Sequence, residues 1–319
     1  SPSHEHTRVL HGDSMPRLIG VRRHGFTMVE LLVTMAILSV VGVVVSRLML
    51  GQQRFYQRTS EQMGMRRELR SAMSLVPADL RSVSSSGGDL TTFDASSLTF
   101  RAVLGASAVC ARPSNSALDL PPLNMARTTI TSWYTTPQAG DTVWAFNDSL
   151  SRGAEDDVWV PLRITAVSQS TTLCPLSPFI DAALDVNKQR FRVSVSPNLP
   201  DSITVGSALR FTRSARFQLT AQSSGRYYLT RAEYVGGAWQ AATAVSGPYE
   251  PPNGSNGGIR FSYFDSLGLA VTNPAQGRDV ARIDMILRAK GANSSGGVGS
   301  SSTTNTDSLA FRIALRNRQ

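Results

Sequence analysis

The sequence predicts an α+β protein in which one long N-terminal helix packs on an antiparallel, β-rich globular head. Three observations support this fold class. An apolar run occupies residues 26–50, long enough to make the first half of the helix transmembrane. A stretch with helical spacing follows over residues 51–81. From residue 82 onward Ser, Thr and Gly are abundant, and apolar residues alternate with polar ones, a pattern typical of half-buried strands.

The composition excludes much of enzyme chemistry. The 319 residues are 41% hydrophobic, enough for a packed core, and the net charge of +9 comes almost wholly from arginine. The histidines are His4, His6, His11 and His24. All precede the apolar run, so a chain that loses this leader has none. We therefore expect no histidine-dependent catalysis, no metal site and no cofactor.

The apolar run reads FTMVELLVTMAILSVVGVVVSRLML, with no charge between Leu31 and Val45. Roughly 20 apolar residues span a bilayer as a helix. Arginines precede the run and no acid follows Asp13 in the leader, so the positive-inside rule places the leader in the cytoplasm. We expect a single-pass membrane protein whose C-terminal head lies outside the cytoplasm.

Three other interpretations of the run compete. A secretory signal peptide has a shorter apolar region and a small-x-small cleavage site, which this run lacks. A twin-arginine export signal could use Arg22 and Arg23, but a glutamate inside the apolar region is foreign to that pattern. A plain transmembrane anchor is the serious alternative. It leaves Glu30 unexplained, because an ionisable group at this depth costs a few kcal/mol.

Residues 25–33 read GFTMVELLV and follow a short basic leader. This string resembles the type IV prepilin signal that pilins share with the pseudopilins of type II secretion. The resemblance implies that a prepilin peptidase cuts between Gly25 and Phe26, removing residues 1–25, and that the new amine of Phe26 is methylated. It also implies that Glu30 neutralises that amine, usually in a neighbouring subunit, as the helix leaves the inner membrane for a filament.

The chemistry of these residues agrees with the implied roles. A flexible glycine before the cleaved bond lets a peptidase bind an extended backbone. In hydrocarbon, a carboxylate and an ammonium reduce each other's desolvation cost far more than in water, which would make Glu30 a registry device. Met15 begins a compact leader by itself, and we expect residues 1–14 to be an artefact of the start site.

The helix is expected to continue beyond the membrane. Apolar residues recur at spacings of three, four and seven: Leu48, Phe55, Leu69, Met73, Val76 and Leu80. One helix from residue 26 to residue 75 or 81 would measure roughly 75 to 85 Å at 1.5 Å per residue. Pro77 either kinks this helix or restarts it for a last turn.

Ten segments of the head, residues 82–319, are predicted as strands. They are 97–103, 127–136, 142–147, 158–167, 191–196, 209–220, 226–234, 259–264, 281–289 and 309–315. The last two alternate most regularly and predict a hairpin. Polar loops are expected at 246–258 and between the hairpin strands. Residues 106–200 match no pattern that we can name and are expected to be an insertion or a second lobe.

The C-terminal region carries a further resemblance. The order IRFSYFDSLG, RDVARIDMILRAKG and LAFRIALRNR is similar to the minor pilin called W and the minor pseudopilin called J. It implies a head in which a long helix packs on β-sheets.

Cys110 and Cys174 are the only cysteines, and both fall in the exported part. A disulfide between them would close a loop of about 65 residues and add about 3 to 4.5 kcal/mol by loop entropy. Two unpaired buried thiols are the alternative. We favour the bridge, because free thiols outside the cytoplasm are a liability.

Other polar and aromatic groups are expected to have structural roles and not to bind ligands. Residues 155–157, Glu-Asp-Asp, are expected to form a solvated acidic turn, because calcium ligands are spaced along a loop. Removing residues 1–25 takes away four arginines and two acids, which leaves a net charge of +7. That charge could attract DNA, but direct DNA binding is not favoured. The tryptophans are expected to pack in the core or on the sheet: Trp133, Trp144, Trp159 and Trp239.

These expectations describe a structural minor pilin-like subunit of a type IV pilus that enters, primes or caps the filament. Its partners would be the prepilin peptidase, other pilin or pseudopilin subunits through the N-terminal helix, and the inner membrane, with no small-molecule substrate. One alternative is a minor pseudopilin of type II secretion. Another is a filament-displayed module that binds DNA or surfaces. A hydrolase is weaker still, since no nucleophile has a histidine partner.

Overall fold

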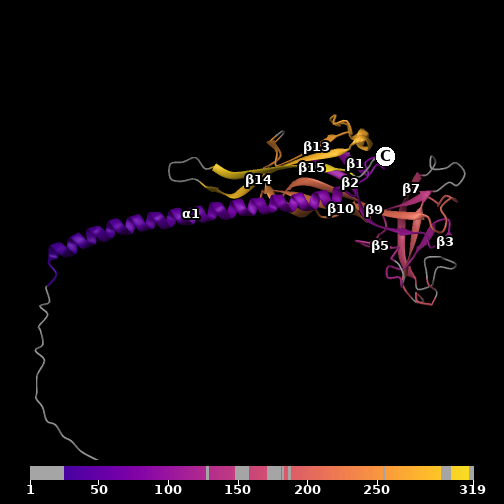
Figure 1. The fold of residues 1–319 in the computed structure, drawn as a ribbon, viewed down its shortest axis with the longest axis horizontal. Coiled ribbons are helices and arrows are strands. Elements are labelled where there is room, and N and C mark those ends of the chain that lie inside the picture. The colour runs from indigo at the N-terminus through magenta and orange to yellow at the C-terminus, as the bar shows by residue number, and fades with distance from the viewer. Residues whose placement is uncertain are drawn as a thin grey trace, which may run out of the picture. The chain divides into compact units, whose positions relative to one another are not determined.

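The computed structural model describes residues 25–126, 129–147, 158–170, 181, 183–185, 188–253, 256–295 and 303–315. The chain divides into two compact units, Ser1–Tyr56 and Gln57–Gln319. Helix α1 (Met28–Leu80) contributes its first half to the first unit and its second half to the second (Figure 1). The predicted fold class, one long helix and an antiparallel β-rich head, is confirmed.

Helix α1 is one element of 53 residues, as predicted. It runs past Pro77, whose carbonyl accepts a hydrogen bond from Arg81 N at 2.9 Å, so a last turn does follow the proline. The buried face of its second half has helical spacing: Met65, Leu69, Ala72, Val76 and Leu80. Met73, which the sequence placed on this face, lies beside it and is exposed.

The head is built from strands whose described pairings are all antiparallel. The strands are β1 (Leu90–Phe93), β2 (Ser97–Ala108), β3 (Ala111–Ser114), β4 (Ala117–Leu120), β5 (Ser132–Trp133), β6 (Thr142–Asn147), β7 (Val158–Ser170), β8 (Arg190–Ser196), β9 (Ala208–Ala221), β10 (Tyr227–Val235), β11 (Ala238–Trp239), β12 (Thr243–Tyr249), β13 (Ile259–Phe264), β14 (Arg282–Ser295) and β15 (Thr303–Ala314). The main path of the sheet is β13-β14-β12-β10-β9-β6-β7-β8-β4-β3. A short 3-10 helix, η3 (Pro274–Asp279), precedes β14.

The predicted C-terminal hairpin is confirmed. Strand β14 pairs with β15 so that Ile283 lies opposite Ile313 and Met285 opposite Phe311. Strand β14 also pairs with β13 on its other side. The alternation read from the sequence therefore corresponds to one face buried in the core.

Two predicted segments were wrong. The strand expected at 127–136 is only the two-residue β5, with residues 127 and 128 outside the described part of the chain. Just before β5, the Thr131 hydroxyl donates to Pro121 O at 2.7 Å, so a side-chain contact holds a segment that does not continue the ladder. The loop expected at 246–258 begins as strand β12, because Tyr249 is buried and pairs with Ala289 of β14.

The core has two clusters. The first joins the buried face of α1 to β1, β2, β9, β10 and β12–β15, and the second gathers residues between Leu104 and Phe211. Strands β10, β14 and β15 lie alongside the second half of α1, whereas β3, β5 and β7 lie beyond its C-terminal end (Figure 1). The second cluster draws largely on the segment expected to be an insertion or lobe. That division of the head, with its boundaries at 106 and 200, stays a prediction.

Strands β2 and β9 each contribute residues to both core clusters. Phe100 and Phe217 stack at 5.4 Å between ring centroids in the first cluster, while Leu104 and Phe211 belong to the second. The pairing of β2 with β9 shifts register between Val103 and Gly105, where one cluster gives way to the other. The two strands therefore link the two parts of the head.

We expect Phe217→Ala to destabilise the head by about 3–5 kcal/mol, because the ring is fully buried and its removal leaves a cavity against Phe100. Gln218→Ala is the matched control, since Gln218 is the next residue of β9 and is exposed. Thermal unfolding of the full chain in detergent, followed by the circular dichroism of the sheet, measures both. Equal transition midpoints for the two variants would contradict this account of the core.

Candidate functional site

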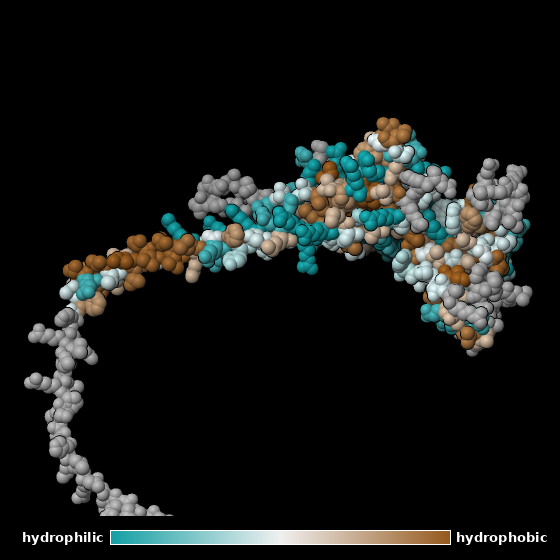
Figure 2. Space-filling model, viewed as in Figure 1, coloured by the Kyte–Doolittle hydropathy of each residue, from teal (hydrophilic) through white to brown (hydrophobic). Residues whose placement is uncertain are grey.

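The first half of α1 has no partner within the described residues. It contains the one described segment that is long and apolar enough to cross a membrane, and none of that segment is buried. In Figure 2, hydrophobic residues (brown) cover most of the visible face of this part of the helix. Because exposed apolar surface of this extent marks a membrane or protein contact, lipid or other chains must cover it.

The chain before the helix is open. Gly25, Phe26 and Thr27 are exposed and lie outside any helix or strand, and nothing lies within 4 Å of the position where Gly25 would carry a Cβ. Phe26 is 72% exposed. The bond predicted to be cut therefore lies in accessible backbone outside any helix or strand.

Thr27 caps the helix. Its hydroxyl oxygen accepts a hydrogen bond from Glu30 N at 3.2 Å, and its carbonyl accepts one from Leu31 N at the same distance. Threonine followed three residues later by glutamate is the pattern of a capping box. Thr27 thus fixes where the helix begins and places Glu30 in its first turn.

Glu30 is exposed, and no cation of the described residues lies against its carboxylate. A negative charge in the first turn is favoured by the helix dipole. That contribution does not remove the cost of placing a lone carboxylate in hydrocarbon. The geometry thus leaves a carboxylate available to an amine from outside this helix or from its own cleaved end.

Comparison with protein families finds one match. Residues 21–46 match the model of the prokaryotic N-terminal methylation motif. The chain carries a type IV prepilin-like signal. The match spans Gly25, Phe26 and Glu30. No curated protein and no solved structure matches the chain significantly.

This match and the structure together describe a pilin-like chain. The prepilin-like signal opens a helix that can cross a membrane, and the helix leads into an antiparallel β-rich head. These are the parts of a type IV pilin-like α+β fold. A single-pass, membrane-anchored pilin or pseudopilin is the coarse description that they support.

The cysteine prediction rests on one described residue. Cys110 is fully buried beside β2 and is disulfide-bonded. Cys174 lies outside the described residues, so its pairing with Cys110 stays a prediction.

The other residues singled out by the sequence separate in space. Trp133 packs against Phe191 and Phe211, as expected of a core-packing residue. Trp159 and Trp239 are 45% and 37% exposed and take the other expected position, packing on the sheet against Phe146 and Tyr234. Residues 155–157, the acidic triplet, and all four histidines lie outside the described residues.

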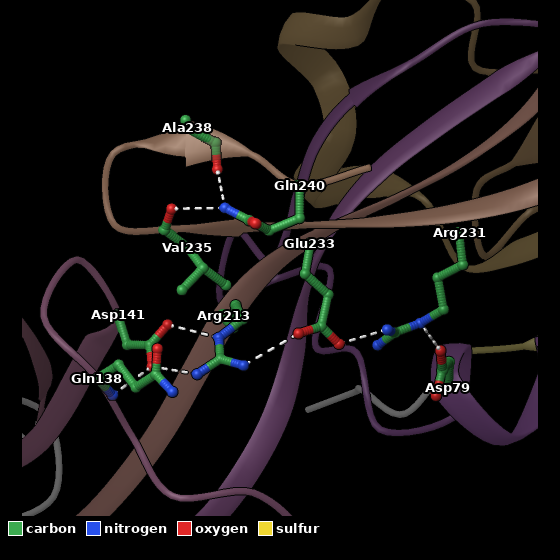
Figure 3. A network of polar contacts seen from close by, with 9 residues as sticks. All are labelled: Asp79, Gln138, Asp141, Arg213, Arg231, Glu233, Val235, Ala238 and Gln240. Carbon is green, nitrogen blue, oxygen red and sulfur yellow. Dashed lines mark hydrogen bonds and ion pairs between the residues drawn. The ribbon is translucent and has the colours of Figure 1, made fainter. Parts of the chain in front are cut away.

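A network of ion pairs that was not predicted from the sequence connects the end of α1 to the sheet (Figure 3). Asp79, in the last turn of α1, accepts a hydrogen bond from Arg231 Nε of β10 at 2.8 Å. Glu233, two residues further along β10, bridges Arg231 and Arg213 of β9, with Arg213 Nη1 at 3.0 Å. The network continues to Asp141, just before β6.

The Arg213–Asp141 pair is the buried centre of this network. Two nitrogens of Arg213 donate to the two oxygens of Asp141, each at 2.8 Å, and both side chains are at most 4% exposed. Gln138 N also donates to Asp141 at 2.7 Å. Such a bidentate pair combines charge with fixed geometry. Arg213 lies between Phe211 and Ala215 on the inward face of β9, where the two core clusters meet.

The network stabilises the charged forms of its members. The hydrogen bond with Asp141 raises the pKa of Arg213; burial opposes this shift, and Glu233 adds to it. Burial acts to raise the pKa of Glu233, but hydrogen bonds from Arg231 and Arg213 outweigh it, so the pKa lies below its ordinary value. Arg213 and Glu233 are therefore ionised at neutral pH.

We expect Asp141→Asn to destabilise the head by about 3–5 kcal/mol, because it removes the buried, bidentate counter-charge of Arg213. The guanidinium is then left with Glu233 alone, which is partly exposed and shared with Arg231. The double variant Asp141→Leu/Arg213→Met removes both charges and is expected to cost less than the single change. Thermal midpoints of the full chain in detergent test the order. A double variant less stable than Asp141→Asn would contradict the assignment of the cost to an unpaired charge.

Proposed function

We propose that this chain is a minor pilin-like subunit of a type IV filament. In this proposal the peptidase cuts after Gly25, the amine of Phe26 is methylated, and the helix moves from the inner membrane into the filament or its initiation complex. The head then remains at the surface and packs against the heads of other subunits to prime or cap the fibre. The chain itself catalyses no reaction.

One observation carries the proposal. The only charge in the first four turns of an otherwise apolar, unburied helix is Glu30, and it lies four residues after the predicted new N-terminus. A simple anchor gains nothing from that carboxylate, since it only opposes insertion. A filament of parallel helices can pair it with the Phe26 amine of a neighbour, which favours the subunit interpretation.

Two alternatives keep the same helix and change its setting. A minor pseudopilin of type II secretion would use the same cleavage and the same pairing in a periplasmic pseudopilus. The resemblance of the C-terminal region to both the W-type and J-type subunits does not separate them, and the neighbouring genes would. A module displayed for binding to DNA or surfaces would need the anchor but not the assembly pairing.

We expect Gly25→Val to block leader removal, because a branched side chain restricts the backbone that the peptidase must bind. Electrophoresis of membranes from cells that express the variant should show a chain longer by the 25-residue leader. Gly42→Val is the matched control, since Gly42 also has open space around it but lies within the helix. Normal maturation of Gly25→Val would place the cleavage elsewhere.

We expect Glu30→Val to be cleaved normally and to fail in assembly, because the Phe26 amine then loses its counter-charge. Leaving one partner of a buried pair alone typically costs about 3–5 kcal/mol. Leader removal, membrane level and co-purification with other filament subunits measure the three steps.

Thr34→Val is the control for Glu30→Val, because it removes a polar group one turn further along without changing the charge. Entry of Glu30→Val into filaments at the wild-type level would overturn the assembly role of Glu30. The display-anchor alternative would then be favoured.

A further inference from the structure

The head contains an open hollow of about 860 Å³ that the filament role does not explain. Its walls come from the turn that follows α1, from strands β1, β2, β6 and β7, and from helix η3. It therefore lies where the two core clusters approach each other, beside the end of α1. The residues that line it include two arginines and two tryptophans, which the sequence scatters over almost 180 positions.

The two arginines meet at Gly88. A Cβ at this glycine would lie 3.7 Å from Arg101 Nη1 and 3.6 Å from Arg278 Nε. The backbone there is left-handed, with φ +76°, which favours glycine. Arg101 Nη1 donates to Gly88 O at 2.6 Å, which holds the guanidinium in place. Arg278 is exposed and is paired with no carboxylate of the described residues.

The positive charge at this end of the hollow is only partly compensated. The buried carboxylate of Asp89 pairs with Arg210 at 2.6 Å, and its other oxygen has no hydrogen-bond partner. Asp89 is the one carboxylate of the described residues that acts on Arg101, whose guanidinium also feels the charges of Arg210 and Arg278. Burial lowers the pKa of Arg101; Asp89 opposes this shift, and the charges of Arg210 and Arg278 add to it. An anion bound between Arg101 and Arg278 would relieve this repulsion.

Two tryptophans, Trp144 and Trp159, line the hollow together with these arginines. The Arg101 guanidinium lies over the ring of Trp144, 4.9 Å from its centroid, and Trp144 Nε1 donates to Thr212 at 3.0 Å. Trp144 is thereby fixed. Trp159 leans on Phe146 with 5.2 Å between ring centroids and keeps 45% of its surface exposed. Its indole is large, rigid and accessible from the hollow, as a stacking surface must be.

The lining indicates the chemistry of the ligand. Among the residues that the structure describes, the lining contains no Asp, Glu, Asn or Gln side chain, the groups that would bind the hydroxyls of a neutral sugar. Arg101 and Arg278 are the only charged side chains among the described residues of this lining. The positive charge of the hollow is therefore confined to one small area, and it does not form the extended basic surface that a nucleic acid backbone would need. A compact anion attached to a ring fits these features.

We propose that this hollow binds an acidic sugar residue, with its carboxylate on Arg101 and Arg278 and its ring against Trp159. Arginine is suited to the carboxylate, because its planar fork binds two oxygens at once. The negative face of an indole attracts the C–H bonds of the sugar ring. This site is separate from the assembly helix, so its test can fail without affecting the filament proposal.

The test uses the full chain in detergent and a uronic acid trisaccharide as the probe. Tryptophan fluorescence should change saturably as the trisaccharide is added, and the change should weaken with salt, since the contact is ionic and partly exposed. The methyl ester of the same trisaccharide is the charge control and should not bind. Equal binding of acid and ester would overturn the proposal, as would no saturable change up to millimolar concentrations.

Two exposed residues provide the variants. Arg278→Gln and Trp159→Ala are each expected to weaken binding roughly tenfold or more, the loss expected for one charge-assisted contact or one stacked ring. Arg260→Gln is the matched control, since Arg260 is an exposed arginine of β13 that does not line the hollow. Far-ultraviolet circular dichroism checks that each variant is folded. Wild-type affinity in Arg278→Gln would overturn the assignment, and so would binding of nucleotides but not of the acidic trisaccharide.

Discussion

The apolar surface of residues 28–50 is the constraint on which the rest of the molecule depends. Nothing in the described chain covers it, so the protein is complete only when lipid or other helices do. Within this surface lies a single carboxylate, Glu30, and no cation of the described residues lies against it. The chain carries a prepilin-like signal at this end, and the cleavage proposed for it would create an amine next to the helix.

The second half of the same helix is, by contrast, covered by the head. From Met65 to Leu80 its apolar face is buried in the first core cluster, and Asp79 joins its last turn to Arg231 of the sheet. The buried Arg213–Asp141 pair then extends this network to the second cluster. One helix thus divides its length between a half that needs other molecules and a half that is built into the head.

The long elements could be predicted from the sequence because their patterns repeat. Helix α1 and the β14–β15 hairpin each carry enough periods to specify an element and its buried face. Strands β1, β3, β4 and β11 have four residues or fewer, too few for a pattern. Pairings between distant segments leave no periodic signal either. The single local sign of the network was Arg213, a charge at an inward position of β9. The hollow is lined by residues such as Gly88, Trp144 and Arg278, which only the fold brings together.

The most direct test of the account is the N-terminus of the mature chain in its assembled state. Filaments sheared from cells that express the protein would be purified, and the chain in them analysed by mass spectrometry. The account predicts that the chain is present and begins at a methylated Phe26. A chain that stays in the membrane fraction with residues 1–25 attached, and never enters filaments, would contradict it.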